Sequence, residues 1–446
     1  MGNRFFLAGI VLILVLSCLF YGSVRFYYLA ICEVLTGVLM AAWLLEAMVK
    51  KRFDLVRGGF WLPVLFFLAV VILQLVPFPL PFIKKLSLST YKIYRDFLPE
   101  GFEPFFFTLS IQRFATLNEL FKALTYFAIF FLVVNRIDNK RDIDFLLKAI
   151  ILLGFCISLW AIIQRFAFPD RVYWFDPPGS AGLPMGPFAN RNNFSGYINM
   201  IIPLGLGYLL QDISFSRRII LGLATAVMTL ALFISYSRAG LIVHMVALIF
   251  IGLLLSFRRK LRNKALLVLL WPTLVIVLFL NYFDPRSVFA RLATLFSKET
   301  FVYLGHGYSW LDILRICRDF PFLGTGLGTF GFISSIYNSN PSQMYFTYAH
   351  NDILQLFSEV GVLGGFCVFW FFAIYFFKVV RHWLNRHDRF IIYGVLGGVG
   401  ALFAILFYSL LDFNLHIPAV ALLFAVLLAV VYRLSILPSV GYAQHG

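Results

Sequence analysis

The most regular feature of the chain is a succession of long apolar runs separated by short polar segments. A helix needs roughly 20 predominantly apolar residues to cross the hydrocarbon core of a bilayer, so the pattern predicts about twelve membrane-spanning helices. Their expected ranges are 5–21, 27–49, 60–76, 117–134, 145–167, 194–210, 219–236, 240–257, 265–282, 353–380, 391–411 and 417–433.

Composition agrees with this interpretation. Of the 446 residues, 61% are hydrophobic and 13% are charged, whereas soluble domains are about 45–50% apolar and about 25% charged. The first run follows Arg4 as a secretory signal would, but it has no small-residue cleavage site after it, so we interpret it as an uncleaved span. We therefore expect an all-α, polytopic transmembrane helical bundle that forms one integral membrane domain over residues 1–446.

The net charge of +16 is explained by where the basic residues lie. They gather in alternate loops between the expected spans, which is typical of cytoplasmic loops, so both termini are predicted to be cytoplasmic. No basic helix or aromatic-basic module of a nucleic-acid binder is present, and no nucleic-acid partner is expected. These basic residues are Lys50, Lys51, Arg52, Arg57, Arg136, Lys140, Arg141, Arg217, Arg218, Arg258, Arg259, Lys260, Arg262, Lys264, Lys378, Arg381, Arg386 and Arg389.

Four segments are then expected on the opposite, periplasmic side: 77–116, 168–193, 235–239 and 283–349. The last forms most of a large loop, 283–350, between the ninth and tenth spans, and it should contain short helices. One of them is predicted at 308–320 by its amphipathic spacing. Its apolar stripe would hold Trp310, Ile313, Leu314 and Cys317, and its polar positions Asp312, Arg315, Arg318 and Asp319.

A polar seam lies where this loop meets the tenth span. Asp352, Gln355 and Glu359 follow one another at helical spacing and share one face of the expected helix. Polar groups at the mouth of a lipid-bounded helix are costly unless they face a protein interior or a wet cavity. His350 stands just before that helix and can reach into such a cavity.

His350 is the first candidate for a general base, because imidazole titrates near neutral pH and can take a proton from a sugar hydroxyl. The alternative is a capping or packing histidine. His416 and His306 are rivals expected on the same side of the membrane. We favour His350 over His416 because its flanking polar residues indicate a cavity.

Arg191 and Arg238 are expected at the same membrane edge as His350, although they come from different loops. Arginines at such an edge can snorkel to lipid phosphates. A guanidinium also matches phosphate geometry bidentately, and two of them can hold a diphosphate and stabilise its charge as it leaves. Arg315 and Arg318 rank third, since a solvated helix face explains them as well.

Two other chemistries find little support in the sequence. Gly326, Gly328 and Gly331 fit the GxGxxG dinucleotide fingerprint, but no parallel strand precedes them, and we interpret the segment as a turn packed on the bundle. No metal site is predicted: Asp352 and Glu359 are not part of a carboxylate cluster. The five cysteines are scattered without metal-binding spacing, and no cofactor is expected.

At these residues the chain resembles the O-antigen ligase and O-antigen polymerase superfamily of bacterial envelope enzymes. The resemblance covers roughly residues 186–420. Its segments are Gly186-Pro-Phe-Ala-Asn190-Arg191-Asn-Asn-Phe, Tyr236-Ser-Arg238-Ala-Gly, Arg315 through Asp319-Phe-Pro-Phe-Leu-Gly-Thr-Gly-Leu-Gly-Thr-Phe, Ala349-His350-Asn351-Asp352-Ile-Leu-Gln-Leu-Phe-Ser-Glu359-Val-Gly and Ser409-Leu-Leu-Asp-Phe-Asn-Leu-His416-Ile-Pro.

The resemblance implies a metal-independent, inverting glycosyltransferase at the periplasmic face of the bacterial inner membrane. Its donor would be a glycan on undecaprenyl diphosphate, and its acceptor the lipid A-core oligosaccharide in ligases. In polymerases the acceptor is the next repeat unit, and in related oligosaccharyltransferases it is a protein hydroxyl. Carried over by motif, Arg191 and Arg238 would bind the diphosphate and His350 would activate the acceptor.

The matching motifs also leave secondary candidates and open alternatives. The candidates are Asn190, Asn351, Asp352, Glu359, His416, Arg315 and Arg318. The spacing from Arg315 to Gly326 is one that some polymerases use, so polymerization stays open. A lipid-linked-glycan flippase is an alternative of another class, although transporters place polar groups near the bilayer midplane and here they gather at one face.

Overall fold

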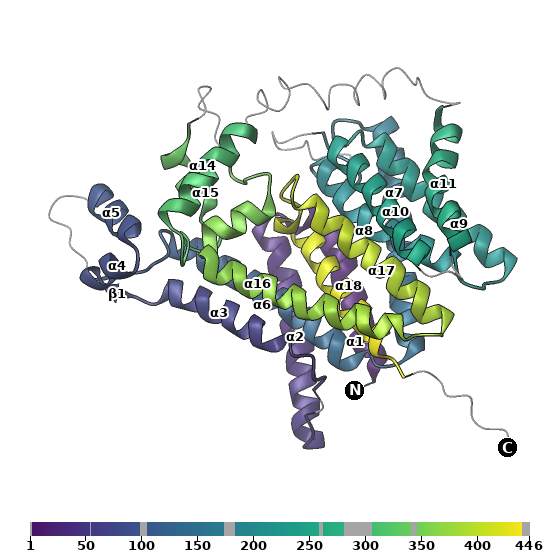
Figure 1. The fold of residues 1–446 in the computed structure, drawn as a ribbon, viewed down its shortest axis with the longest axis horizontal. Helices are drawn as coiled ribbons and strands as arrows, with labels where there is room; N and C mark the ends of the chain where they lie inside the picture. Colours follow the sequence, from purple (N-terminus) through teal and green to yellow (C-terminus); the bar gives the residue numbers. More distant parts are fainter. Residues whose placement is uncertain are drawn as a thin grey trace.

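The structure is a computed structural model that describes residues 2–53, 55–98, 105–173, 183–257, 262–280, 306–339 and 346–438. It confirms the all-α fold class, since a pair of two-residue antiparallel strands is the only sheet in the described part. The elements are α1 (Asn3–Leu19), η1 (Tyr21–Ser23), α2 (Phe26–Lys50), α3 (Trp61–Leu75), β1 (Phe78–Pro79), α4 (Leu80–Leu86), α5 (Leu88–Phe97), β2 (Phe106–Phe107), α6 (Arg113–Arg136), α7 (Lys140–Ala167), α8 (Arg191–Leu209), α9 (Phe215–Ile234), α10 (Arg238–Phe257), α11 (Arg262–Leu280), α14 (His306–Asp319), α15 (Phe330–Tyr337), α16 (Asp352–Leu384), α17 (Arg389–Tyr408), η4 (Asn414–His416) and α18 (Pro418–Ile436) (Figure 1).

A helix of the structure lies at each range that the sequence predicts to span the membrane. Among the described residues, 8 helices are both long and apolar enough to cross a bilayer. The helices α1 and α3 are also apolar but shorter. The polytopic character is therefore confirmed, and the number of crossings stays a prediction.

The centre of the bundle is formed by α8, α17 and α18. In the apolar windows of α17 and α18, 78% and 89% of the residues are buried. Glycines let α8 and α17 approach closely: a Cβ added to Gly207 would lie 2.6 Å from the Tyr393 carbonyl oxygen, and one on Gly397 would lie 2.6 Å from that of Pro203. Small residues at helix contacts are how membrane bundles gain packing without a hydrophobic driving force.

The predicted basic loops come together at one end of this bundle. Lys140 at the start of α7 pairs with Asp388 just before α17, with 3.1 Å between Nζ and Oδ2. Near the end of α18, Arg433 donates from Nε to the Ile137 carbonyl, 2.8 Å away, between α6 and α7. The alternate-loop pattern therefore predicted correctly which segments share an end. Which side of the membrane that end faces stays a prediction.

At the other end, α16 is broken near its start. Gly361 has φ 64° within the helix, a left-handed conformation that favours glycine. The segment 320–329 fills the break, because the amide of Val362 donates to Pro321 O at 2.8 Å and that of Gly326 to Glu359 O at 2.9 Å. A Cβ on Gly361 would lie 2.3 Å from Phe322 O, so the break needs glycine.

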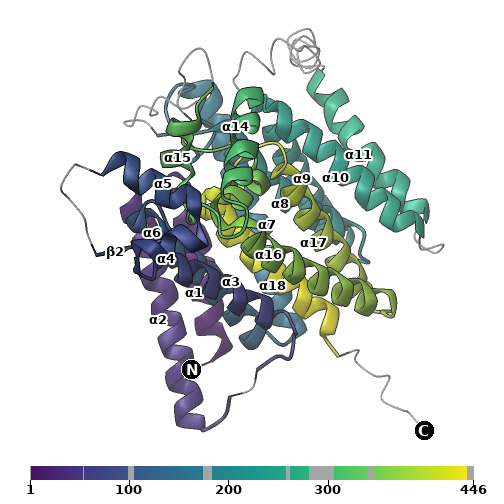
Figure 2. The same cartoon turned by 60° about the vertical axis from the view of Figure 1, so that its left-hand side comes forward.

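The two long segments at this end contain helices (Figure 2). Residues 77–116, one of the segments expected on the periplasmic side, include α4 and α5. In the larger loop, α14 confirms the predicted amphipathic helix, and residues 281–305 and 340–345 lie outside the described part. The predicted stripe was wrong at Leu314, which is 54% exposed, because Ile313 and Ile316 instead pack against Phe330 of α15.

Candidate functional site

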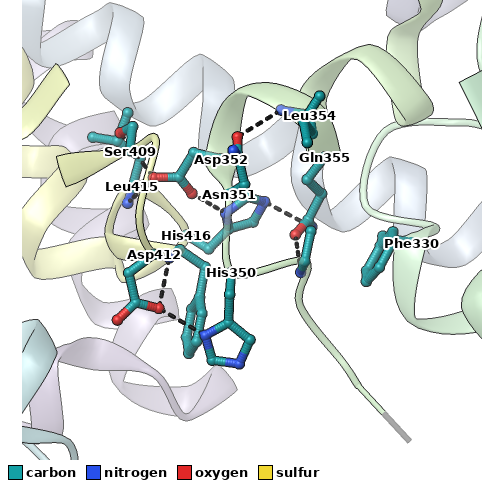
Figure 3. Close-up of polar contacts among 12 residues, drawn as sticks. Phe330, His350, Asn351, Asp352, Leu354, Gln355, Ser409, Asp412, Leu415 and His416 are labelled. Carbon is teal, nitrogen blue, oxygen red and sulfur yellow. Dashed lines mark hydrogen bonds and ion pairs between the residues drawn. The ribbon is translucent and has the colours of Figure 1, made fainter. Parts of the chain in front are cut away.

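The candidate site lies at the end of the bundle opposite the basic loops, where α8, α10 and α16 begin and α17 ends. His350 precedes α16 and is one of five non-glycine residues with positive φ in the described part, at 50°; this left-handed conformation costs about 1–3 kcal/mol. The next residue, Asn351, caps the helix by accepting from the Leu354 amide at 2.9 Å. The start of α16 therefore fixes the position of His350 (Figure 3).

His350 is held by a carboxylate from the loop after α17. Its Nδ1 lies 2.9 Å from Oδ1 of Asp412, whose side chain is only 3% exposed, whereas that of His350 is 25% exposed. The same Asp412 oxygen accepts from the Phe413 amide at 2.9 Å. A buried carboxylate beside Nδ1 favours the tautomer that donates from Nδ1, which leaves Nε2 as the basic nitrogen.

A chain of hydrogen bonds leads from this pair to Asn192 and Ser237, which adjoin the two predicted arginines in the sequence. Asn192 donates to Oδ2 of Asp412 at 2.8 Å, and Ser237 donates to Oδ1 of Asn192 at 2.7 Å. Arg191 is the first residue of α8 and adjoins Asn192; Arg238 is the first residue of α10 and adjoins Ser237. The structure thus brings the starts of both helices to His350, where the positive end of each helix dipole favours anions.

His416, the rival base, uses both ring nitrogens within the protein. Its Nδ1 lies 2.7 Å from Asp352 Oδ1, and its Nε2 lies 2.9 Å from the side-chain nitrogen of Gln355 (Figure 3). Burial lowers the pKa of His416, but the hydrogen bond and charge of Asp352 outweigh it, so its pKa is raised above the usual value. Asp352 also accepts from Ser409 and from the Leu415 amide. This second pair ties α16 to the loop that carries Asp412.

Glu359 and the glycine-rich segment 326–331 form one structural unit. The Glu359 carboxylate accepts from the amide of Gly328 at 2.8 Å, from that of Phe330 at 3.2 Å and from the Gln355 side chain at 3.0 Å. The predicted shared face is confirmed, because Asp352, Gln355 and Glu359 are all buried. The segment is the packed turn that the sequence indicates, and its amides face a carboxylate, which opposes phosphate binding there.

The remaining candidates stand apart from His350 or have a structural role. Arg315 pairs with Asp312 at 3.2 Å and is 52% exposed; Arg318 pairs with Asp319 at 3.1 Å and is 77% exposed. Both therefore fit the solvated-face interpretation. Asp312 itself was expected on the polar face but is buried, since it accepts from the Ser339 amide at 3.0 Å. The side chain of His306 lies outside the described part.

Of three further residues near the site, one caps a helix and two were missed. Asn190 caps α8 by accepting from the Asn192 amide at 2.8 Å. Asp412 and Asn192 were not among the predicted site residues. The available signal was that Asp412 follows a predicted span on the same side as His350, within the motif that ends in His416. Its pairing with His350 depends on tertiary contact and is not visible in spacing.

An apolar cavity of about 280 Å³ opens below the site between α3, α6, α16 and α18. Phe67 and Tyr126 line it from α3 and α6, and Phe371 and Phe424 from α16 and α18. Leu415, next to His416, lines it as well. The cavity therefore reaches the loop that holds Asp412.

Comparison with known proteins shows which protein family the sequence resembles. A family model described as O-antigen ligase matches residues 223–369. The resemblance to the O-antigen ligase and polymerase superfamily is thereby confirmed. The matched region contains Arg238 and His350, whereas Arg191, Asp412 and His416 lie outside it. No curated protein matches the chain.

Proposed function

We propose that this protein is an O-antigen ligase-type glycosyltransferase, which moves a glycan from undecaprenyl diphosphate to the lipid A-core oligosaccharide at the periplasmic face of the inner membrane. The observation that carries the proposal is the His350–Asp412 pair, 2.9 Å apart. Hydrogen bonds connect this pair to the helix starts that bear Arg191 and Arg238. A base, its orienting carboxylate and two cations are what transfer from a diphosphate-linked donor requires.

In the proposed reaction, Nε2 of His350 takes the proton of the acceptor hydroxyl as its oxygen attacks the anomeric carbon. The bond between that carbon and the phosphate oxygen breaks, and the diphosphate leaves with the bonding electrons. Attack from the face opposite the leaving group inverts the anomeric configuration. Asp412 stabilises the imidazolium that forms, which is the task of a buried carboxylate beside a catalytic histidine.

Arg191 and Arg238 are proposed to bind the leaving diphosphate. Charge grows on the bridging and terminal oxygens as the glycosidic bond breaks, and positioned guanidinium groups stabilise that charge. The starts of α8 and α10 add the positive ends of two helix dipoles. With cations supplied by side chains, this assignment needs no metal ion at the leaving group.

The surroundings suit a lipid-linked sugar. Phe413 lies edge-on to His350 with ring centroids 4.8 Å apart, and Tyr348 stacks on Phe413 at 4.6 Å. Aromatic rings of this kind can stack against sugar rings next to the base. We assign the apolar cavity of about 280 Å³ to the first isoprenyl units of the carrier, because burial of each CH₂ group contributes about 0.8 kcal/mol.

The test is glycan transfer by the purified protein from an undecaprenyl-diphosphate-linked donor to lipid A-core. We expect His350→Ala, Arg191→Ala and Arg238→Ala each to lose transfer while they keep the wild-type melting temperature. His387→Ala and Arg218→Ala are matched controls at exposed positions at the other end of the bundle, and both should keep transfer activity. Full activity in all three site variants would refute the mechanism, and glycan translocation without a new glycosidic bond would favour a transporter.

The acceptor is tested separately in a deletion strain. Loss of every glycan-capped lipopolysaccharide band is the result expected of a ligase. Retention of a core with one repeat unit would indicate a polymerase of the same superfamily. An unaltered lipopolysaccharide profile would exclude both and favour another polysaccharide or a protein hydroxyl as acceptor.

A further inference from the structure

A second polar cavity lies at the basic end of the bundle, away from His350. Its volume is about 480 Å³, and it is formed where α7, α9 and α17 begin and α8 ends. Four cations and one carboxylate line it, together with uncharged side chains. The charged residues are Lys140, Arg141, Lys148, Arg217 and Asp144. This composition favours a negatively charged occupant.

The carboxylates that line or adjoin the cavity already have basic partners. Asp144 accepts from Lys148 at 2.5 Å and from the Tyr208 hydroxyl at 2.8 Å. Asp388 pairs with Lys140 at 3.1 Å. Asp212, next to the cavity, pairs with Arg389. The charges that remain for a ligand are therefore positive.

Arg141 and Arg217 both line the cavity, from the first turns of α7 and α9. Neither makes an ion pair in the part of the chain that the structure describes, and both are exposed. Two guanidinium groups on one cavity can each form a bidentate contact with a phosphate. Lys140 and Lys148 already pair with carboxylates, so they contribute only to the positive electrostatic potential of the cavity.

Gln211 provides a hydrogen-bond donor in the same cavity. Its side chain is 8% exposed and lines the cavity. Among the described residues, no hydrogen-bond partner lies near its side-chain nitrogen. A buried donor without a partner costs about 1–3 kcal/mol, and an anion in the cavity would satisfy it. The first turn of α9 also favours an anion, because the Ser214 side chain does not cap its amide groups.

We propose that this cavity binds the phosphate headgroup of an anionic phospholipid in the leaflet at the basic end of the bundle. Arg141 and Arg217 hold the phosphodiester, and the Gln211 amide donates to one of its oxygens. The apolar wall supports a lipid as occupant rather than free phosphate, because Leu221 and Phe390 line the cavity and Ile220 on α9 is 68% exposed toward the expected lipid. Basic cavities between membrane helices are a recurring site for such headgroups.

The experiment measures lipid binding by the full chain in detergent, through the rise of its melting temperature with added lipid. Phosphatidylglycerol should raise the melting temperature by about 2–5 °C at saturation. Phosphatidylcholine should have less effect, because its trimethylammonium group is repelled by the surrounding cations. The double variant Arg141→Gln/Arg217→Gln should bind phosphatidylglycerol at least about tenfold more weakly, and Gln211→Leu about threefold.

The control Arg218→Gln/Arg381→Gln removes the same charge at exposed positions that do not line this cavity and should bind within about twofold of wild type. Unchanged affinity in the Arg141→Gln/Arg217→Gln protein would overturn the site. Equal binding of phosphatidylcholine would overturn the anionic selectivity. Inorganic phosphate that reproduces the full shift, with no further effect of lipid, would overturn the lipid assignment. None of these readouts depends on glycan transfer.

Discussion

Asp412→Asn keeps His350 in place but removes the carboxylate that orients its ring, so it tests whether that orientation matters for transfer. The aspartate oxygens accept from the His350 ring at 2.9 Å, from the backbone amide of Phe413 at 2.9 Å and from the side-chain amide of Asn192 at 2.8 Å. An asparagine has the same shape but one acceptor fewer. If its oxygen faces His350 and Phe413, its NH₂ group opposes the donor of Asn192. If it turns over, it donates to Nδ1 and forces the proton onto Nε2, where the base is needed.

The size of the effect follows from the charge that is lost. A charge-assisted hydrogen bond contributes about 1.5–3 kcal/mol and a neutral one about 0.5–1.5 kcal/mol. The attraction between carboxylate and imidazolium is about 4 kcal/mol at 4 Å for an effective dielectric constant near 20, which sets an upper bound. We therefore expect a loss of about 2–4 kcal/mol in the transition state, or a fall in kcat of about 30- to 1,000-fold.

The assay is the initial rate of glycan transfer at saturating donor and acceptor, with the melting temperature measured on the same samples. Asp96→Asn, the same change at an exposed carboxylate of α5, is the control. Combined with His350→Ala, Asp412→Asn should cost little more than His350→Ala alone, because the two residues act as a unit. A kcat for Asp412→Asn within twofold of wild type, or losses that simply multiply, would show that Asp412 does not act through His350.

Three further outcomes follow from the structure. The raised pKa of His416 means that its protonated form stabilises the fold fully below about pH 6.5, and that this contribution is lost as pH rises through the raised pKa. The melting temperature should therefore fall from pH 6 to pH 9, and His416→Gln should reduce that fall; an identical profile in the variant would contradict the assignment. Gly361→Ala should lower stability by about 1–3 kcal/mol, since φ is 64° and the new Cβ meets Phe322 O; urea titration would show no change if the break were not strained. Arg315→Ala and Arg318→Ala should keep transfer rates within about twofold, because each is exposed and paired with its own carboxylate; a large loss of rate would bring them back into the site.

Much of the fold is encoded in short-range patterns. The apolar runs predict the helices because a bilayer demands long apolar segments, and alternate basic loops predict which segments share an end. Helical periodicity places Asp352, Gln355 and Glu359 on one buried face without knowledge of their partners. These predictions succeed because each depends on neighbours along the chain.

Tertiary contact decides the rest. Asp412 lies 62 positions from His350, and no spacing rule connects them. Gly361 lies in an apolar run that predicts one continuous helix, and the break exists because the segment 320–329 supplies partners for the freed backbone groups. The sequence of α14 alone does not show whether Leu314 or Ile316 belongs to the buried stripe, because contact with α15 determines which face is covered.

The transfer rates of His350→Gln and His416→Gln, measured side by side, determine which of the two histidines is the general base. Glutamine keeps a polar side chain but cannot take the proton, and general-base catalysis contributes about 10²–10⁴-fold. His350→Gln is predicted to fall by that factor, and His416→Gln to stay within about tenfold of wild type. The reverse ranking, with both proteins folded, would assign the base to His416 and exclude His350.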